Sequence, residues 1–265
     1  MPAPSADQPY PVIPTPHVDG TKASKGTIYV ATVMALAHNM FIRYLNSIYL
    51  QATGISQPKD IADFLFYCQT WYKVIHEHHT GEEKLLFPRI DALTGDGSME
   101  ESAEEHKLFT DGIDEFYKYV SDTKPEEYDG AKLRSIIDSF APALMKHLRA
   151  EVQKLTEVGE KVGGDKLQVL FDEFEAQLLK ESQKEWDPHV IIPAVIGAVD
   201  HEFEDGMHAS WPPFPWFVPL LSKWIFSRKY SGSWRFSPCH NFKRRELRFV
   251  GDDYEKAVVT AVNLL

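Results

Sequence analysis

Several features on which common protein classes depend are scarce in this 265-residue sequence. It has two cysteines, Cys68 and Cys239, which lie far apart and provide neither a disulfide framework nor a thiolate metal site. No uninterrupted apolar run of about 18 residues is present, so no membrane-spanning helix is expected. Alternating strand patterns of any useful length are also missing, which excludes a protein built on β-sheets.

Positive charge is scarce as well. The chain has 28 Lys and Arg against 39 Asp and Glu, for a net charge of -11 with histidine neutral. Nucleic acid and anionic membranes both attract basic surfaces, so neither is expected as a partner. The stretch PWFVPLLSKWIF at 215–226 has the aromatic and basic composition of a membrane-interface segment, but its prolines and the overall charge argue against that role.

The hydrophobic pattern predicts helices throughout. Four long segments place apolar residues at alternating three- and four-residue steps, which is the period of an amphipathic helix; these segments are 25–52, 58–92, 98–122 and 126–160. Ser98 and Glu101 have the spacing of a capping box at the start of the third segment. A fifth helix is expected over 166–185, and a sixth within 188–208.

These segments predict an all-α fold, an up-down-up-down four-helix bundle with a helical and irregular C-terminal extension. We divide the chain into an arm at 1–24, the bundle at 25–162 and an extension packing on it at 163–265. The arm is Pro-rich and lacks the basic and apolar regions of a signal peptide, so a flexible arm and a reducing, cytoplasmic setting are expected.

Polar residues interrupt the apolar stripe of each bundle helix. His38, His79, His106 and His147 each occupy a stripe position where an apolar side chain belongs. His79 and His147 are followed one turn later by Glu83 and Glu151, again on the stripe. Burying such groups costs free energy unless they are paired or coordinated. Four imidazoles and two carboxylates facing one core match the needs of a pair of metal ions, with iron, manganese and zinc all suited to nitrogen and oxygen ligands.

The register around residue 80 is not unique. His78 and Glu82 have the same four-residue spacing as His79 and Glu83, and His76 lies one turn before His79. The stripe favours His79 and Glu83. His76 and His78 are then expected to be solvated or to support a ligand, and Glu82 to accept a hydrogen bond from a ligand imidazole.

Four stretches carry a family resemblance: HN at 38–39, HEHHTGEEKLLFP at 76–88, EEHKLF at 104–109 and HLRAE at 147–151. Together they resemble the hemerythrin-like, or HHE cation-binding, family over residues 28–160. The stretch DHEFEDGMHASWPPFPW at 200–216 is similar to the extension of fungal members. The resemblance implies a non-haem site for two iron ions, with manganese and zinc ranking behind iron. The implied ligands are His38, His79, Glu83, His106, His147 and Glu151.

The sequence departs from the oxygen-carrying hemerythrins at two places. Thr110 stands where those proteins have a second histidine on the third helix, and the fourth helix has HxxxE in place of HxxxxD. With one imidazole fewer, a pure oxygen carrier is disfavoured. The expected function is binding of metal and of O2 or a related small molecule, in oxygen, redox or iron sensing or handling. A di-iron oxidase or oxygenase acting on a small organic substrate is the alternative, and a structural zinc bundle is a third.

The extension has its own acidic and histidine cluster. His201 and His208 lie beside Glu202, Glu204 and Asp205. Two interpretations remain open: a second metal site, or a structural cap whose aromatic side chains pack over the bundle and shape access to the metals.

Overall fold

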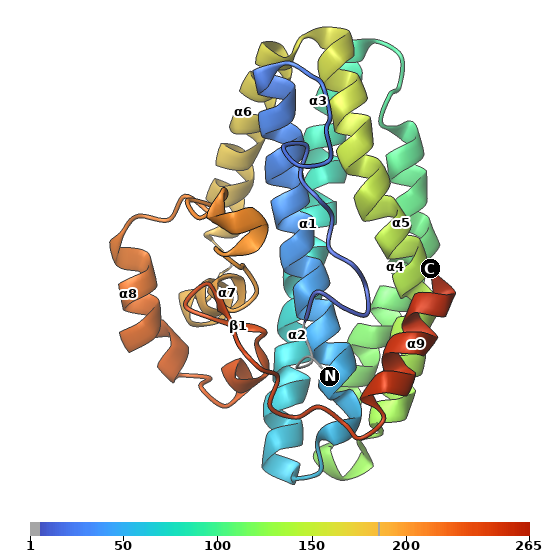
Figure 1. The fold of residues 1–265 in the computed structure, drawn as a ribbon, viewed down its shortest axis with the longest axis vertical. Helices are drawn as coiled ribbons and strands as arrows, with labels where there is room; N and C mark the ends of the chain where they lie inside the picture. The colour runs from blue at the N-terminus through green and yellow to red at the C-terminus, as the bar shows by residue number, and fades with distance from the viewer. Residues whose placement is uncertain (1–5, 185) are drawn as a thin grey trace.

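The computed structural model describes residues 6–184 and 186–265, and this part of the chain is built almost entirely of helices (Figure 1). Four long helical segments run alongside one another. They are α1 (Lys25–Gln51), α2 (Pro58–Gly81) with its continuation α3 (Phe87–Thr94), α4 (Glu100–Asp122) and α5 (Gly130–Val162). Helix α5 packs against both α1 and α4, and α2 packs against α4. The predicted all-α bundle with a C-terminal extension is confirmed.

Shorter elements make up the extension. Its helices are α6 (Gly164–Ser182), α7 (Pro188–Ile196), α8 (Phe217–Trp224) and α9 (Tyr254–Leu264). A small antiparallel hairpin joins β1 (Cys239–His240) to β2 (Lys243–Arg244). Single 3-10 turns are η1 (Ala52–Gly54), η3 (Pro125–Glu127), η4 (Phe203–Gly206), η5 (Phe226–Arg228) and η6 (Ser233–Phe236). The helix expected within 188–208 therefore ends early, before a turn in which Glu204 and Asp205 adopt left-handed backbone angles.

Helix starts differ in how they are capped. The Ser24 side chain accepts a hydrogen bond from the Thr27 N–H at the start of α1, and Asp129 does the same for two N–H groups of α5. The capping box expected at 98–101 does not form. Met99 precedes α4 with its side chain buried and its N–H donated to Asp91, and this places the Ser98 hydroxyl beside Asp96 instead.

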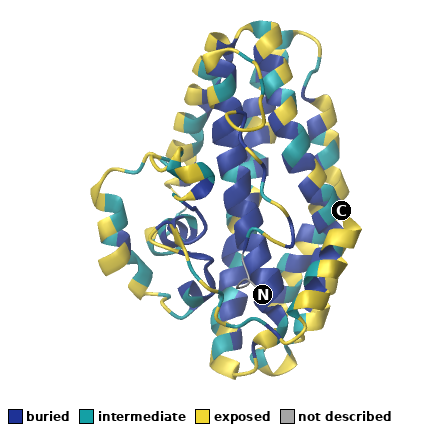
Figure 2. Ribbon diagram, in the orientation of Figure 1, coloured by how far each residue is buried: buried dark blue, intermediate teal, exposed yellow. Residues whose placement is uncertain are grey.

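Helix α1 is the central helix of the bundle. Figure 2 shows that most of its length is buried. By length and composition alone, Lys25–Gly54 is apolar enough to cross a membrane, but 83% of that window is buried inside the protein. Because the other bundle helices and the extension surround α1, its apolar composition fits a core helix.

The N-terminal segment lies along α1. Residues 1–5 are outside the described part of the chain, but from Ala6 onwards two asparagines of α1 hold the backbone. The Asn46 side chain accepts from the Tyr10 N–H at 3.0 Å and donates to the Ala6 and Tyr10 carbonyls. Asn39 pairs in the same way with the N–H and carbonyl of Ile13. The segment expected to be a flexible arm is thus packed from Ala6 onwards, because buried amides of α1 satisfy its backbone.

The starts of α1 and α6 meet at two glycines. A Cβ placed on Gly26 would lie 2.4 Å from the backbone carbonyl oxygen of Gly164, so nothing larger than glycine fits without moving one helix. This contact fixes the position of the extension's first helix against the bundle.

The Gly26→Ala substitution tests this contact. Replacing glycine by alanine normally favours a helix, but here we expect overpacking to lower the free energy of unfolding by about 2 kcal/mol. Urea unfolding measures it, with Lys25→Ala at the preceding exposed position as the control. A Gly26→Ala protein as stable as the control would contradict the close approach.

Candidate metal centre

The end of α2 brings three polar side chains to one face. Successive residues of an α-helix are about 100° apart, so Glu82 lies between His78 and His79 around the axis. A π-helical turn (η2, Glu82–Leu86) begins at this residue, and the Phe87 N–H bonds to the Glu82 carbonyl five residues back. Such turns often occur at functional sites. The local geometry allows the Glu82 carboxylate to reach groups beside either imidazole.

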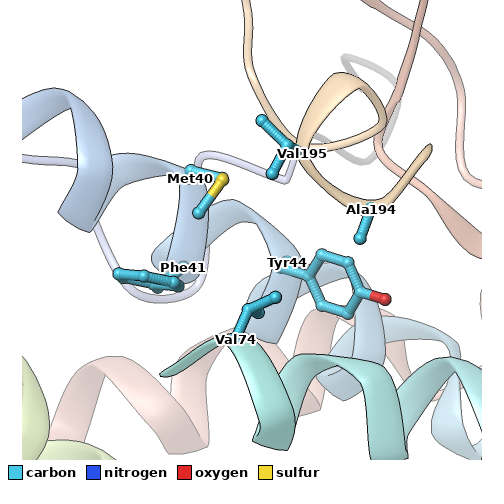
Figure 3. Close-up of a pocket in the computed structure, with 6 residues that line it drawn as sticks. All are labelled: Met40, Phe41, Tyr44, Val74, Ala194 and Val195. Carbon is cyan, nitrogen blue, oxygen red and sulfur yellow. The ribbon is translucent and has the colours of Figure 1, made fainter. Parts of the chain in front are cut away.

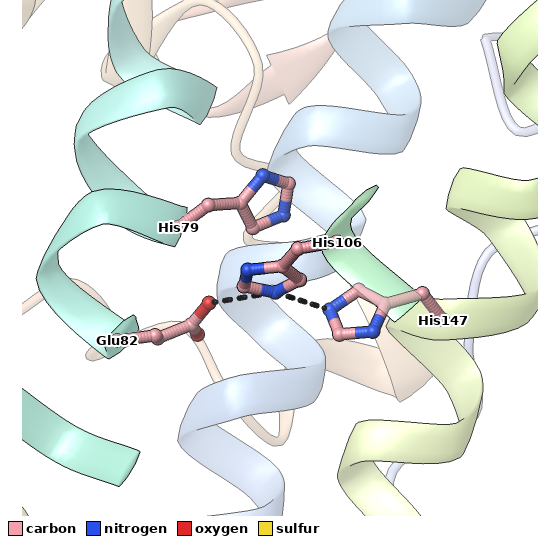
Figure 4. Close-up of side chains that lie close together, drawn as sticks. All are labelled: His79, Glu82, His106 and His147. Atoms are coloured by element: carbon pink, nitrogen blue, oxygen red, sulfur yellow. Dashed lines mark hydrogen bonds and ion pairs between the residues drawn. The ribbon is translucent and has the colours of Figure 1, made fainter. Parts of the chain in front are cut away.

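Two groups of potential metal ligands meet at Glu82. Within each group, one nitrogen or oxygen atom of every residue lies within 4.8 Å of the others. The first group comprises His79, Glu82, His106 and His147, and the second comprises His38, His78, Glu82 and Glu151. Figure 4 shows the first group converging from α2, α4 and α5. Every member is buried except His78, which is partly buried. Glu151 lies between the groups, 3.4 Å from His38 and 3.7 Å from His147.

The outer nitrogens of His106 and His147 both face carboxylates. His106 Nδ1 lies 2.7 Å from Glu83, and His147 Nδ1 lies 3.1 Å from Glu105. An ionised carboxylate only accepts hydrogen bonds, so each Nδ1 carries a proton. The two Nε2 atoms are 3.0 Å apart. They can share one proton in a hydrogen bond, or both can point their lone pairs at a bound cation.

The same pattern recurs in the second group. His38 Nδ1 donates to the Leu148 carbonyl at 2.8 Å, and its Nε2 lies 3.2 Å from His78 Nε2. His79 Nε2 and all four carboxylate oxygens of Glu82 and Glu151 are buried without a hydrogen bond of acceptable geometry, although imidazole nitrogens lie nearby. Buried polar atoms are almost always satisfied in folded proteins. This donor set fits metal ions better than it fits hydrogen bonding alone.

Burial also sets the charge of the cluster. It lowers the pKa of His78 to about 4 and that of His147 to about 3, and lowers the pKa of His79 further with the help of neighbouring imidazoles. These rings are therefore neutral near pH 7 and present lone pairs. For Glu82, burial and then the charge of Glu151 raise the pKa well above its ordinary value. Burial also raises the pKa of Glu151, but nearby imidazoles outweigh this effect.

Five of the six residues singled out in the sequence come together here: His38, His79, His106, His147 and Glu151. Glu83 does not join them. Its side chain is 50% exposed and contacts the outer nitrogen of His106, so it holds a ring in position from outside. Glu82 takes the inner position because it projects between His78 and His79. The assignment of individual ligands remains a prediction, now with Glu82 in the place first given to Glu83.

His78 changes the count of imidazoles. The absence of a histidine at position 110 suggested a shell with one imidazole fewer than an oxygen carrier, and Thr110 indeed only bonds the His106 carbonyl of its own helix. The structure brings a fifth imidazole from α2 instead. The adjacent pair His78-His79, followed by Glu82, was the signal for it. A single apolar stripe includes only one of these two histidines, although both flank the Glu82 carboxylate.

The cluster in the extension has ordinary hydrogen-bond partners. His201 Nε2 lies 2.9 Å from the Trp211 carbonyl, and the ring stacks on Phe242. Glu204 accepts from the Thr15 N–H and hydroxyl and lies 2.9 Å from His208. Within residues 6–184 and 186–265, these side chains are in neither of the two potential metal groups. Glu204 and His208 connect the extension to Thr15 of the N-terminal segment, whereas His201 contacts Trp211 and Phe242 within the extension. A role as a cap that shapes access to the metals stays a prediction.

A narrow apolar pocket lies next to the second group (Figure 3). It lies among α1, α2 and α7 and is lined by Met40, Phe41, Tyr44, Val74, Ala194 and Val195. The Phe41 ring is 4.8 Å from the His78 ring, measured between centroids. One wall of the pocket is therefore one side chain away from the candidate metal centre, and α7 of the extension closes the other.

The sequence is similar to that of known metal-binding domains over the segment that contains the site. The sequence profile of the hemerythrin HHE cation-binding domain matches residues 30–159, the segment that contains both groups. The chain is also 36% identical over 233 residues to the dimeric xanthone biosynthesis cluster protein R11 of Cryptosporiopsis sp. (strain 8999), covering 87% of each chain. The chain belongs to the hemerythrin HHE cation-binding family. The match between this relative and the present chain continues beyond the bundle into the extension. No solved structure matches the present chain.

Matched substitutions distinguish the two neighbouring glutamates. We expect Glu82→Gln to remove at least one metal ion per chain, because the buried charge shared by both groups is lost. Glu83→Gln should keep the full stoichiometry and weaken affinity about tenfold, as loss of an outer hydrogen bond to a ligand does. Elemental analysis and metal titration measure both. Loss of metal in Glu83→Gln with retention in Glu82→Gln would return the ligand role to Glu83.

Proposed function

We propose that this HHE protein binds two iron ions and, through them, O2 or a related small molecule. The observation that carries the proposal is the convergence of five imidazoles and two carboxylates on a buried space. There, His79 Nε2 and the carboxylate oxygens of Glu82 and Glu151 lack hydrogen bonds. Nitrogen and oxygen donors suit iron, manganese and zinc. Family membership supports a metal-binding role, and the family resemblance points to iron.

The ligand groups suggest how the two ions would be held. His79, His106 and His147 would hold one, His38 and His78 the other, with Glu82 and Glu151 between them. Bound iron would supply the capacity to bind O2 and to exchange electrons. The protein's own contribution is to bury the donors and to keep His78, His79 and His147 neutral. It also fixes the orientation of rings through Glu83, Glu105 and the Leu148 carbonyl.

The surroundings favour a small apolar ligand. Phe109 lies 5.1 Å from the His79 ring and Phe87 lies 5.5 Å from the His106 ring, and Phe41 covers His78. These aromatic walls exclude water and offer little to a large polar substrate. A fifth imidazole also supports reversible binding, which weakens the argument against a pure oxygen carrier drawn from Thr110.

A second candidate is a di-iron oxidase acting on a small organic molecule. The relative's name associates that protein with xanthone biosynthesis. The apolar pocket against α7 lies beside His78, but in this structure it has no free space for such a molecule. Oxygen consumption that depends on an added organic substrate would favour this candidate. Reversible spectral change without product would favour binding or sensing.

Iron loading tests the metal proposal directly. We expect protein reconstituted anaerobically with ferrous iron to retain two irons per chain, to gain a charge-transfer band on exposure to O2, and to melt at higher temperature. Ligand binding to the native state at a hundred times Kd adds about 2.7 kcal/mol of stability. Elemental analysis, absorption spectra and thermal melts measure these effects.

Two histidines of the same helix provide matched variants. His79→Ala should lose at least one iron and its share of the stabilisation, whereas His76→Ala should lose neither, because His76 is exposed and stacks on Tyr72. Retention of both irons by His79→Ala, or wild-type protein that binds no transition metal, would refute the proposal. If the protein retains zinc and no iron, the remaining function is that of a structural zinc bundle.

A further inference from the structure

Helix α8 is amphipathic, but its large apolar side chains are exposed and its buried side chain is polar. Trp216, Leu220 and Trp224 are 80%, 50% and 58% exposed, whereas the small polar Ser222 is 2% exposed. With about 100° between successive residues, these apolar side chains, together with Phe217 and Lys223, fall within an arc of about 120°. Ser222 lies on the opposite side, toward the protein. The helix presents its large apolar side chains to the outside.

This apolar face stands apart from the bundle. Figure 1 shows α8 at the edge of the extension, away from α1 to α5, and Figure 2 shows much of its surface exposed. Ile225, which follows the helix, is also about half exposed. Soluble proteins rarely expose contiguous apolar surface of this kind unless it is an interaction site. The prolines that argued against a helix here are compatible with one, because Pro219 lies in the first turn.

Cations lie on and near α8. Between residues 217 and 249 the chain has eight Lys and Arg and one acidic residue, Glu246. Four of these cations pair with acidic residues outside this segment: Lys229, Arg235, Lys243 and Arg244. Within the described residues, Lys223, Arg228, Arg245 and Arg248 form no such pair. Lys223 lies over the Trp224 ring, 5.3 Å from its centroid.

From this juxtaposition we propose that the α8 face docks on an anionic lipid surface, with Trp216, Leu220 and Trp224 at the level of the headgroups and Lys223 contacting their phosphates. Aromatic and leucine side chains beside lysine and arginine are the composition of helices that lie in a membrane interface. The acidic charge of the bundle does not prevent this, because screening limits its reach to about 8 Å in physiological salt. The expectation that excludes membranes rests on the net charge and on the prolines of 215–226, and Pro219 is compatible with α8.

A second copy of the chain suits this face less well. A symmetric dimer through α8 would bring the same surface of each copy together, and with it two sets of the same cations. An anionic bilayer brings opposite charge to those cations instead. The proposal is independent of the metal centre, since no residue of the two ligand groups lies on α8.

Vesicle co-sedimentation of the full chain tests the proposal. We expect binding to vesicles of phosphatidylcholine mixed with phosphatidylserine, accompanied by a blue shift of tryptophan emission, and little binding to phosphatidylcholine alone. The double variant Trp216→Ser/Trp224→Ser should bind at least about tenfold more weakly, and Lys223→Glu should lose about tenfold of the preference for anionic vesicles.

The matched control is Val169→Ser, which removes an exposed apolar side chain from α6 and should leave vesicle binding unchanged. Circular dichroism and metal content, which should match those of the wild type, show that each variant is folded. Failure of the wild type to bind anionic vesicles would overturn the proposal, and so would binding unaffected by the double variant. Self-association that the double variant abolishes, without vesicle binding, would assign the face to a second copy.

Discussion

The constraint on which this structure depends is the burial of imidazole nitrogens and carboxylates that face one another. Glu83 and Glu105 hold the outer nitrogens of His106 and His147, and this fixes the inner nitrogens of both rings toward the same space. Burial opposes protonation of His147, and His79 Nε2 and the carboxylate oxygens of Glu82 and Glu151 have no hydrogen bond. A bound cation would satisfy these atoms. The bundle therefore carries, at its centre, a buried set of donors suited to metal ions.

The rest of the fold keeps that centre dry and in place. Helix α1 is buried along nearly its whole length, and the N-terminal segment and extension cover the sides that a bare four-helix bundle would leave open. Asn39 and Asn46 hold the segment against α1, and the hydroxyl of Ser47 in the same helix donates to the Phe236 carbonyl of the extension. One apolar helix thus connects the candidate metal centre, the N-terminal segment and the extension.

The sequence predicted the bundle well because its signals are periodic and repeated. The bounds of α1, α4 and the fifth helix differ from expectation by a few residues at most, and five of the six proposed ligands converge. Glu83 lies outside the cluster, at a place where two adjacent histidines face the centre and a π-helical turn follows, and its role stays a prediction. The packed N-terminal segment depends on buried amides of α1 that local sequence does not reveal. The outward apolar face of α8 likewise became clear only once burial separated Ser222 from its neighbours.

The most direct test of the central claim is a crystal structure of iron-loaded protein with anomalous diffraction measured at the iron absorption edge. The account predicts two peaks inside the bundle, one beside His79, His106 and His147 and one beside His38 and His78, with the Glu82 carboxylate between them. Peaks at the surface or in the extension would contradict it, as would a centre without iron in which Glu83, and not Glu82, faces the imidazoles.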